Sequence, residues 1–223
     1  MMTHMPFLTR DRDGERVLLF CEAERVAEQT PRWKLHFQLG GEETRRLDTG
    51  FAEDVVECCP TGWNDDDGWH VSFIAGMALH RMDGPRLEQL RPPQVAYGPT
   101  RAGFVHRNRL VHAEEGMIRV LEPSGNRSIE LGGAMIYRVA YRADAPDTLL
   151  ISGRMKTQTE VFAVEHDLAT GRQEIVVCDD RPAYKHTVLG DEILYAERFG
   201  DGFEDRRIVS AKTTQRVGVS MAC

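Results

Sequence analysis

The sequence predicts an all-β fold, a five-bladed β-propeller of four-stranded antiparallel blades, and three observations support this. A short apolar run returns five times, beginning at Leu18, Val71, Leu110, Leu149 and Ile193. Successive runs start 39 to 53 residues apart, the spacing typical of propeller blades. Each run follows a turn signal such as Asp-Gly or Arg-Asn, and a more polar segment comes after it. We therefore expect one blade per run.

The five runs share a four-residue register. They are Leu18–Cys21, Val71–Ile74, Leu110–Ala113, Leu149–Ser152 and Ile193–Ala196. The first position is aliphatic and the third is bulky in all five. A nearly continuous apolar run is typical of a strand that is covered on both faces. We therefore expect each run to be the second strand of its blade.

The neighbouring segments supply the other strands. A strand should precede each tight turn, because turn pairs of this kind join hairpins. The predicted innermost strands are Met5–Thr9, Val55–Gly62, Val95–His106, Ile136–Arg142 and Tyr184–Leu189. The predicted third strands are Trp33–Leu39, Met77–Met82, Met117–Leu121, Glu160–Glu165 and Arg206–Ala211. The blades then cover about residues 1–50, 51–93, 94–133, 134–180 and 181–223 of one domain.

A β-sandwich is the main alternative, because it also has many short strands at regular turn spacing. It does not explain one register that returns five times. The longest interval, from Leu18 to Val71, holds extra residues at Arg25–Arg32 and Trp63–Asp67. Insertions fall in loops, and loops on a rigid scaffold often carry binding sites. This favours a site among the loops of blades one and two.

Composition excludes several classes of function. The formal charge of −7 argues against binding to nucleic acid. No apolar stretch is long enough to span a bilayer, and residues 1–10 lack the layout of a signal peptide, so we expect a cytoplasmic or virion-associated protein without membrane contact. The cysteines and histidines lack metal-ligand spacing, and Asn64–Gly68 is interpreted as a solvated turn, so we predict no metal and no cofactor.

Aromatic and charged residues gather near the starts of the predicted inner strands, which surround a central funnel. The candidate ligand-binding residues are Tyr97, Arg101, Tyr137, Arg138, Tyr184, Lys185 and His186. Rings and paired polar groups of this kind suit a glycan, which stacks and makes several hydrogen bonds, and they also suit a protein partner. The alternative interpretation is structural: the tyrosines fill the neck of the ring and the arginines pair with carboxylates.

The segment from Glu57 to Val71, which starts Glu-Cys-Cys-Pro, resembles the Glu-Cys-Pro segment of five-bladed glycosidases of the invertase and fructanase type. The resemblance implies that Glu57 is a general acid/base, a role that requires a raised pKa. The Asn-Asp-Pro and Arg-Asp-Pro segments of those enzymes are absent. Asp54 is the candidate second carboxylate, by proximity in sequence, because glycoside hydrolysis uses two.

These observations lead to three hypotheses. The first is a non-enzymatic binding module that recognises a carbohydrate or a protein partner through its funnel and rim loops. The second is a sugar-processing enzyme with Glu57 as acid/base. The third is a structural or adsorption component of a larger, possibly viral, assembly. Propellers host both enzymes and scaffolds, so the fold alone does not choose among them.

Overall fold

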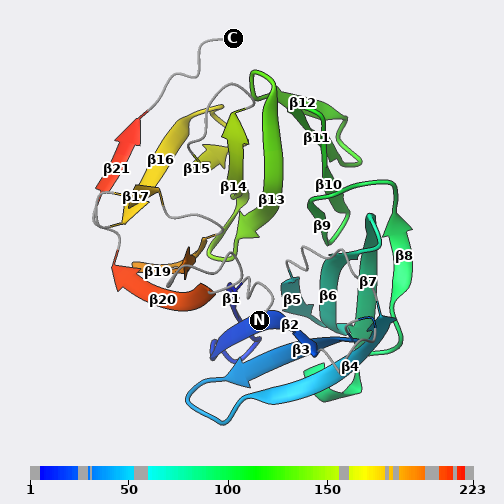
Figure 1. Cartoon of the computed structure of the whole chain (residues 1–223). Helices are drawn as coiled ribbons and strands as arrows, with labels where there is room; N and C mark the ends of the chain where they lie inside the picture. The colour runs from blue at the N-terminus through cyan, green and yellow to red at the C-terminus, as the bar shows by residue number, and fades with distance from the viewer. Residues whose placement is uncertain are drawn as a thin grey trace.

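The protein is a five-bladed β-propeller in which the sheets are arranged around a common centre (Figure 1). This description rests on a computed structural model that describes residues 6–24, 30, 32–52, 60–155, 161–178, 181–182, 186–198, 206–212 and 215–218. The predicted site residues Asp54, Glu57, Tyr184 and Lys185 lie outside these residues. Within them, no helix has the length and hydropathy needed to cross a bilayer.

Blades one to three each form a four-stranded antiparallel sheet with the strands in chain order. Blade one comprises β1 (Phe7–Arg10), β2 (Arg16–Glu24), β3 (Arg32–Leu39) and β4 (Arg45–Ala52). Blade two comprises β5 (Thr61–Asp65), β6 (Gly68–Ala75), β7 (Ala78–Gly84) and β8 (Gln94–Tyr97), with the short 3-10 helix η1 (Leu87–Gln89) between β7 and β8. Blade three comprises β9 (Gly103–His106), β10 (Arg109–Glu114), β11 (Met117–Leu121) and β12 (Arg127–Glu130).

Blades four and five are linked by the end of the chain. Blade four comprises β13 (Ala134–Arg142), β14 (Ala145–Met155), β15 (Val161–Asp167), β16 (Gln173–Cys178) and the two-residue β17 (Arg181–Pro182). Blade five comprises β18 (Thr187–Leu189), β19 (Glu192–Arg198) and β20 (Arg206–Lys212). The next strand, β21 (Gln215–Gly218), pairs with β16 and so extends blade four (Figure 1).

The predicted register is confirmed. All five apolar runs lie on the second strand of a blade, namely β2, β6, β10, β14 and β19. One predicted inner strand was wrong. Val95–His106 forms two strands, because Gly98 and Pro99 interrupt it and proline has no N–H for a sheet ladder. Tyr97 therefore ends β8, the outermost strand of blade two, whereas β9 is the inner strand of blade three.

Within the described residues, the ring closes without a blade shared between the two ends of the chain. The inner strands β1, β5, β9, β13 and β18 contact one another in turn, and β18 returns to β1. At this closure the backbone N–H of Leu8 donates to Oγ1 of Thr187 at 3.0 Å. Arg16 donates twice to Glu192, at 2.8 and 3.0 Å, and Leu8 packs in a small cluster with leucines of blade five. Side-chain contacts between blades one and five thus hold the ring closed.

Candidate functional site

The described residues among the predicted funnel set are scattered. Tyr97 stacks against His112 of blade three, with ring centroids 4.2 Å apart, at the outer edge of blade two. Arg101 is exposed in the connection between β8 and β9. Tyr137 and Arg138 are neighbours on the inner strand β13, and His186 is fully buried just before β18. The structure thus leaves Tyr97 away from the inner strands.

Arg138 is 1% exposed and crosses from blade four to the start of the chain. Its Nη2 donates to the carbonyl oxygen of Pro6 at 2.6 Å. Tyr137 lies at a β-bulge, because the register of β13 shifts between Ile136 and Arg138. A guanidinium that is buried and bonded to backbone is positioned to hold two blades together, which is the structural interpretation of Arg138.

Aromatic side chains that were not predicted to be site residues pack at the centre of the propeller. His106 lies 4.3 Å from the ring of Tyr141 and 5.4 Å from that of Trp63, measured between centroids. The hydroxyl of Tyr141 donates to the carbonyl oxygen of Gly62 at 2.7 Å, and burial raises its pKa. Burial, with the nearby Arg107 and Arg109, lowers the pKa of His106 to about 4. These side chains fill the centre of the propeller.

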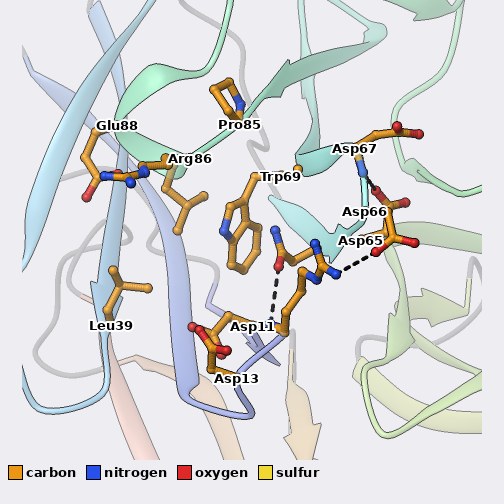
Figure 2. A pocket seen from close by; sticks show the side chains of 14 residues that line it. Asp11, Asp13, Leu39, Asp65, Asp66, Asp67, Trp69, Pro85, Arg86 and Glu88 are labelled. Atoms are coloured by element: carbon orange, nitrogen blue, oxygen red, sulfur yellow. Dashed lines mark hydrogen bonds and ion pairs between the residues drawn. The ribbon is translucent and has the colours of Figure 1, made fainter.

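A pocket of about 710 Å³ opens instead between blades one and two (Figure 2). Its walls come from the β1–β2 turn, the β5–β6 turn and the connection that contains η1. The β5–β6 turn follows the end of β5, whereas the predicted rim loops lead into the starts of inner strands. The pocket therefore lies at the opposite end of the blades from the predicted rim. Six carboxylates line it: Asp11, Asp13, Asp65, Asp66, Asp67 and Glu88.

A tight hairpin presents three of these carboxylates. Asp65 pairs with Gly68, so Asp66 and Asp67 form a two-residue turn. Gly68 has φ +113, and an added Cβ would lie 2.4 Å from the carbonyl oxygen of Gly84, so the turn requires glycine. Trp63–Asp67 was predicted to be an inserted loop, and this was wrong, because Trp63, Asn64 and Asp65 belong to β5. No group of metal-ligating side chains is found among the described residues.

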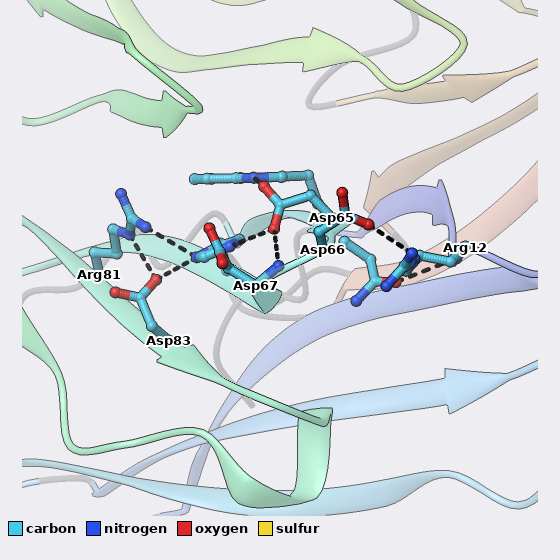
Figure 3. Close-up of polar contacts among 9 residues, drawn as sticks. Arg12, Asp65, Asp66, Asp67, Arg81 and Asp83 are labelled. Atoms are coloured by element: carbon cyan, nitrogen blue, oxygen red, sulfur yellow. Dashed lines mark hydrogen bonds and ion pairs between the residues drawn. The ribbon is translucent and has the colours of Figure 1, made fainter.

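Asp65 is fixed by its neighbours (Figure 3). Its Oδ1 lies 3.0 Å from Nε2 of His70 and accepts the N–H of Asp67 at 3.0 Å, and its Oδ2 accepts Nε1–H of Trp63 at 3.1 Å. Burial acts to raise the pKa of Asp65, but these hydrogen bonds outweigh it and the pKa is lowered. Asp65 is thus held as a saturated acceptor that shapes the hairpin.

His70 connects this hairpin to the next strand of the blade. Its Nδ1 lies 2.6 Å from Oδ1 of Asp83, which also accepts Nε–H of Arg81 at 2.6 Å. The guanidinium of Arg81 lies over the ring of Trp63, 5.2 Å from its centroid. Burial would raise the pKa of Asp83, but the hydrogen bonds from His70 and Arg81 lower it overall. The floor of the hairpin is therefore rigidly supported.

Other lining groups differ in their partners. Asp66 pairs with Arg12 at 2.6 Å, and Glu88 pairs with Arg45 at 2.5 Å. The side chains of Asp13, Asp67 and Arg86 make no hydrogen bond or ion pair with any described residue. These three groups are available to a ligand.

Trp69 forms an inner wall of the pocket (Figure 2). Trp69 as a whole is only 6% exposed. Its indole N–H nevertheless donates to no group in the described part of the chain, whereas that of Trp63 donates to Asp65. An indole N–H is a donor only, so one that is free of protein partners in a pocket wall can donate to a ligand oxygen.

Comparisons with known proteins support the fold. No model of a protein family matches the sequence, and no curated protein does. Among solved structures, a glycosyl hydrolase from Bacteroides ovatus is similar over 98% of this chain and 86% of its own, with a TM-score of 0.50 and 11% identity. Hsv2 from Kluyveromyces lactis is similar over 86% of this chain and 70% of its own, with a TM-score of 0.40 and 8% identity. The first of these is similar to this chain in fold alone.

Proposed function

We propose that the protein is a binding module that recognises a carbohydrate in the pocket between blades one and two. The observation that carries this proposal is the indole N–H of Trp69, which has no partner among the described residues and shares the pocket with the available carboxylates of Asp13 and Asp67. A sugar hydroxyl both donates and accepts, so one ligand can satisfy Asp13, Asp67 and Trp69 together. The volume of about 710 Å³ lies in the range of small-molecule sites.

The pocket supports binding better than hydrolysis. A glycosidase needs one carboxylic acid with a raised pKa and a second carboxylate at a defined separation. The pKa of Asp65 is lowered, and both of its oxygens already accept hydrogen bonds. Glu57 and Asp54, the two carboxylates of the glycosidase hypothesis, remain predictions.

A glycan-array screen of four proteins tests the proposal. Wild type and Glu130→Gln, which changes an exposed acid on blade three, should bind the same glycans. Trp69→Phe keeps an aromatic ring but removes the pyrrole part of the indole with its N–H, and we expect it to lose about five- to tenfold in affinity, the value of one hydrogen bond. Glu57→Gln should bind as wild type does. Loss of binding in Glu57→Gln with normal binding in Trp69→Phe would place the ligand in the funnel and contradict the proposal.

A further inference from the structure

We propose that the saccharide recognised by this pocket carries a positive charge, and that it is an amino sugar with a free ammonium group. This inference rests on the proposed function and names the class of its ligand. Six carboxylates line the pocket against two guanidiniums, those of Arg12 and Arg86. A cationic ligand would interact with this surplus of negative charge more favourably than a neutral sugar.

The surplus remains after internal pairing is subtracted. Arg12 neutralises Asp66, and Arg45 neutralises Glu88. Asp65 is held by His70 and Trp63 within the hairpin, and Oδ1 of Asp11 accepts the N–H of Glu15. The remaining lining charges are Asp13 and Asp67, whose side chains have no described partner, and Arg86. The available part of the pocket therefore has two acids for one base, and Asp11 adds a further negative charge.

Trp69 indicates which class of cationic ligand the pocket accepts. Its N–H donates to no group among the described residues, and it belongs to a residue more than nine-tenths buried in the pocket wall, so it can donate to an oxygen of a ligand. A bare polyamine has ammonium groups but no oxygen that could accept this hydrogen bond. An amino sugar carries an ammonium and several hydroxyl oxygens on one rigid ring, which matches carboxylates beside an indole donor. The ammonium should lie between Asp13 and Asp67.

The test is calorimetric titration of the full chain with glucosamine tetrasaccharide and with its fully N-acetylated counterpart, in which each ammonium is replaced by a neutral acetamide. At pH 6 and low salt, we expect wild type to bind the free amine form about tenfold more tightly, since hydrogen bonds from an ammonium to carboxylates are about twice as strong as neutral ones. Asp13→Asn with Asp67→Asn should reduce this preference to about twofold, because the charge is removed and the shape is kept. Glu130→Gln is the matched surface control and should keep the full preference.

Each outcome bears on one of the two proposals. Equal binding of the acetylated and free amine forms would overturn the inference and leave the carbohydrate proposal intact. Spermidine or a lysine-rich peptide that binds as tightly as the amino sugar, with no effect of Trp69→Phe, would overturn both, because the site would then be a simple cation site. No binding of any probe or array glycan would also overturn both. Circular dichroism of each variant verifies that a loss is not unfolding.

Discussion

The junction between blades three and four is closed by charged side chains, whereas the junction between blades one and two is open. Arg109 crosses from blade three, donating to Pro146 O at 2.9 Å and to Asp147 at 2.7 Å. It also donates to Glu122 of its own blade at 3.0 Å. Between blades one and two, Arg12 pairs with Asp66, and their side chains are 56% and 92% exposed. One junction is filled and the other surrounds a pocket.

The repeat register explains the difference. Arg109 directly precedes the apolar run of blade three, and Asp147 lies two residues before that of blade four. The same two positions at the ring closure hold Glu192 and Arg16, a salt bridge with the charges exchanged. Between blades one and two these positions hold Val17 and Trp69.

Neither Val17 nor Trp69 can form an ion pair. Leu39, opposite Val17 in the β2–β3 ladder, stands where blade three has Glu122, and it lines the pocket together with Trp69. A pocket is therefore found where one copy of the bridge is replaced by apolar residues and an indole.

The largest expected effect is at the filled junction. Arg109→Ala leaves Glu122, whose side chain is 12% exposed, without one of its two arginine partners. A charge left partly unpaired in a buried position should lower the free energy of unfolding by about 2 to 3 kcal/mol. Urea denaturation measures this. Arg119→Ala, which breaks an exposed pair with Glu114, is the control and should change stability by less than about 0.5 kcal/mol.

The junction between blades two and three is packed with aromatic side chains, and the pH dependence of the free energy of unfolding tests it. The pKa of His106 is about 4 in the folded protein and ordinarily about 6.5 in an unfolded chain. The unfolded state therefore binds more protons between these values, and stability present above pH 6.5 is lost as the pH falls towards 4. We expect His106 to contribute about 1 to 3 kcal/mol to this loss.

His106→Phe should reduce the slope of unfolding free energy against pH in that window. The pKa values of His112 and His166 are also lowered by burial, so the slope should not vanish. An identical slope in His106→Phe and wild type would contradict the assignment of a neutral ring to the centre.

The closing salt bridge should give an intermediate effect. Arg16 and Glu192 bond in a bidentate geometry, with side chains 32% and 31% exposed. A double-mutant cycle to alanine should yield a coupling energy of about 1 kcal/mol, reduced by salt. Arg16→Glu with Glu192→Arg should restore most of the stability that either single reversal removes. Failure of the double reversal to recover stability would mean that the two positions are not equivalent to Arg109 and Asp147.

Arg12→Ala should have the smallest effect on stability. Its partner Asp66 is almost fully exposed, so the free energy of unfolding should change by less than about 0.5 kcal/mol. Removal of this guanidinium makes the pocket more acidic, and affinity for glucosamine tetrasaccharide should rise about twofold. Weaker binding of the tetrasaccharide by Arg12→Ala would argue against a cationic ligand.

The repeated runs made the blades predictable, because each second strand is covered on both faces and its pattern is local. Pro99, which ends the strand that was expected to carry Tyr97 inward, is itself a local signal in the sequence. Two other features depended on contacts that a local pattern does not contain. β21 pairs with β16 of blade four, and this pairing depends on contacts at the edge of the sheet. The pocket joins Leu39, Trp69 and Glu88 across two blades.

The candidate site was predictable only in its region. The long first interval directed attention to blades one and two, and the Asn64–Asp67 segment does line the pocket. The role of Trp69 depends on which position of one blade faces which position of the next. The sequence does contain a signal for this role. One pair of repeat positions holds Arg109 and Asp147 at one junction and Glu192 and Arg16 at another, and the same pair holds Val17 and Trp69 between blades one and two.

The most direct test of the account is an NMR titration of the three tryptophan indole N–H signals with glucosamine tetrasaccharide. Trp33, Trp63 and Trp69 each give one signal, and the Trp69→Phe variant assigns the signal that disappears. The account predicts a saturable shift of the Trp69 signal, with those of Trp33 and Trp63 nearly unchanged, since the Trp63 N–H is already bonded to Asp65. A shift confined to Trp63, at the centre of the ring, would contradict it and move the ligand to the funnel.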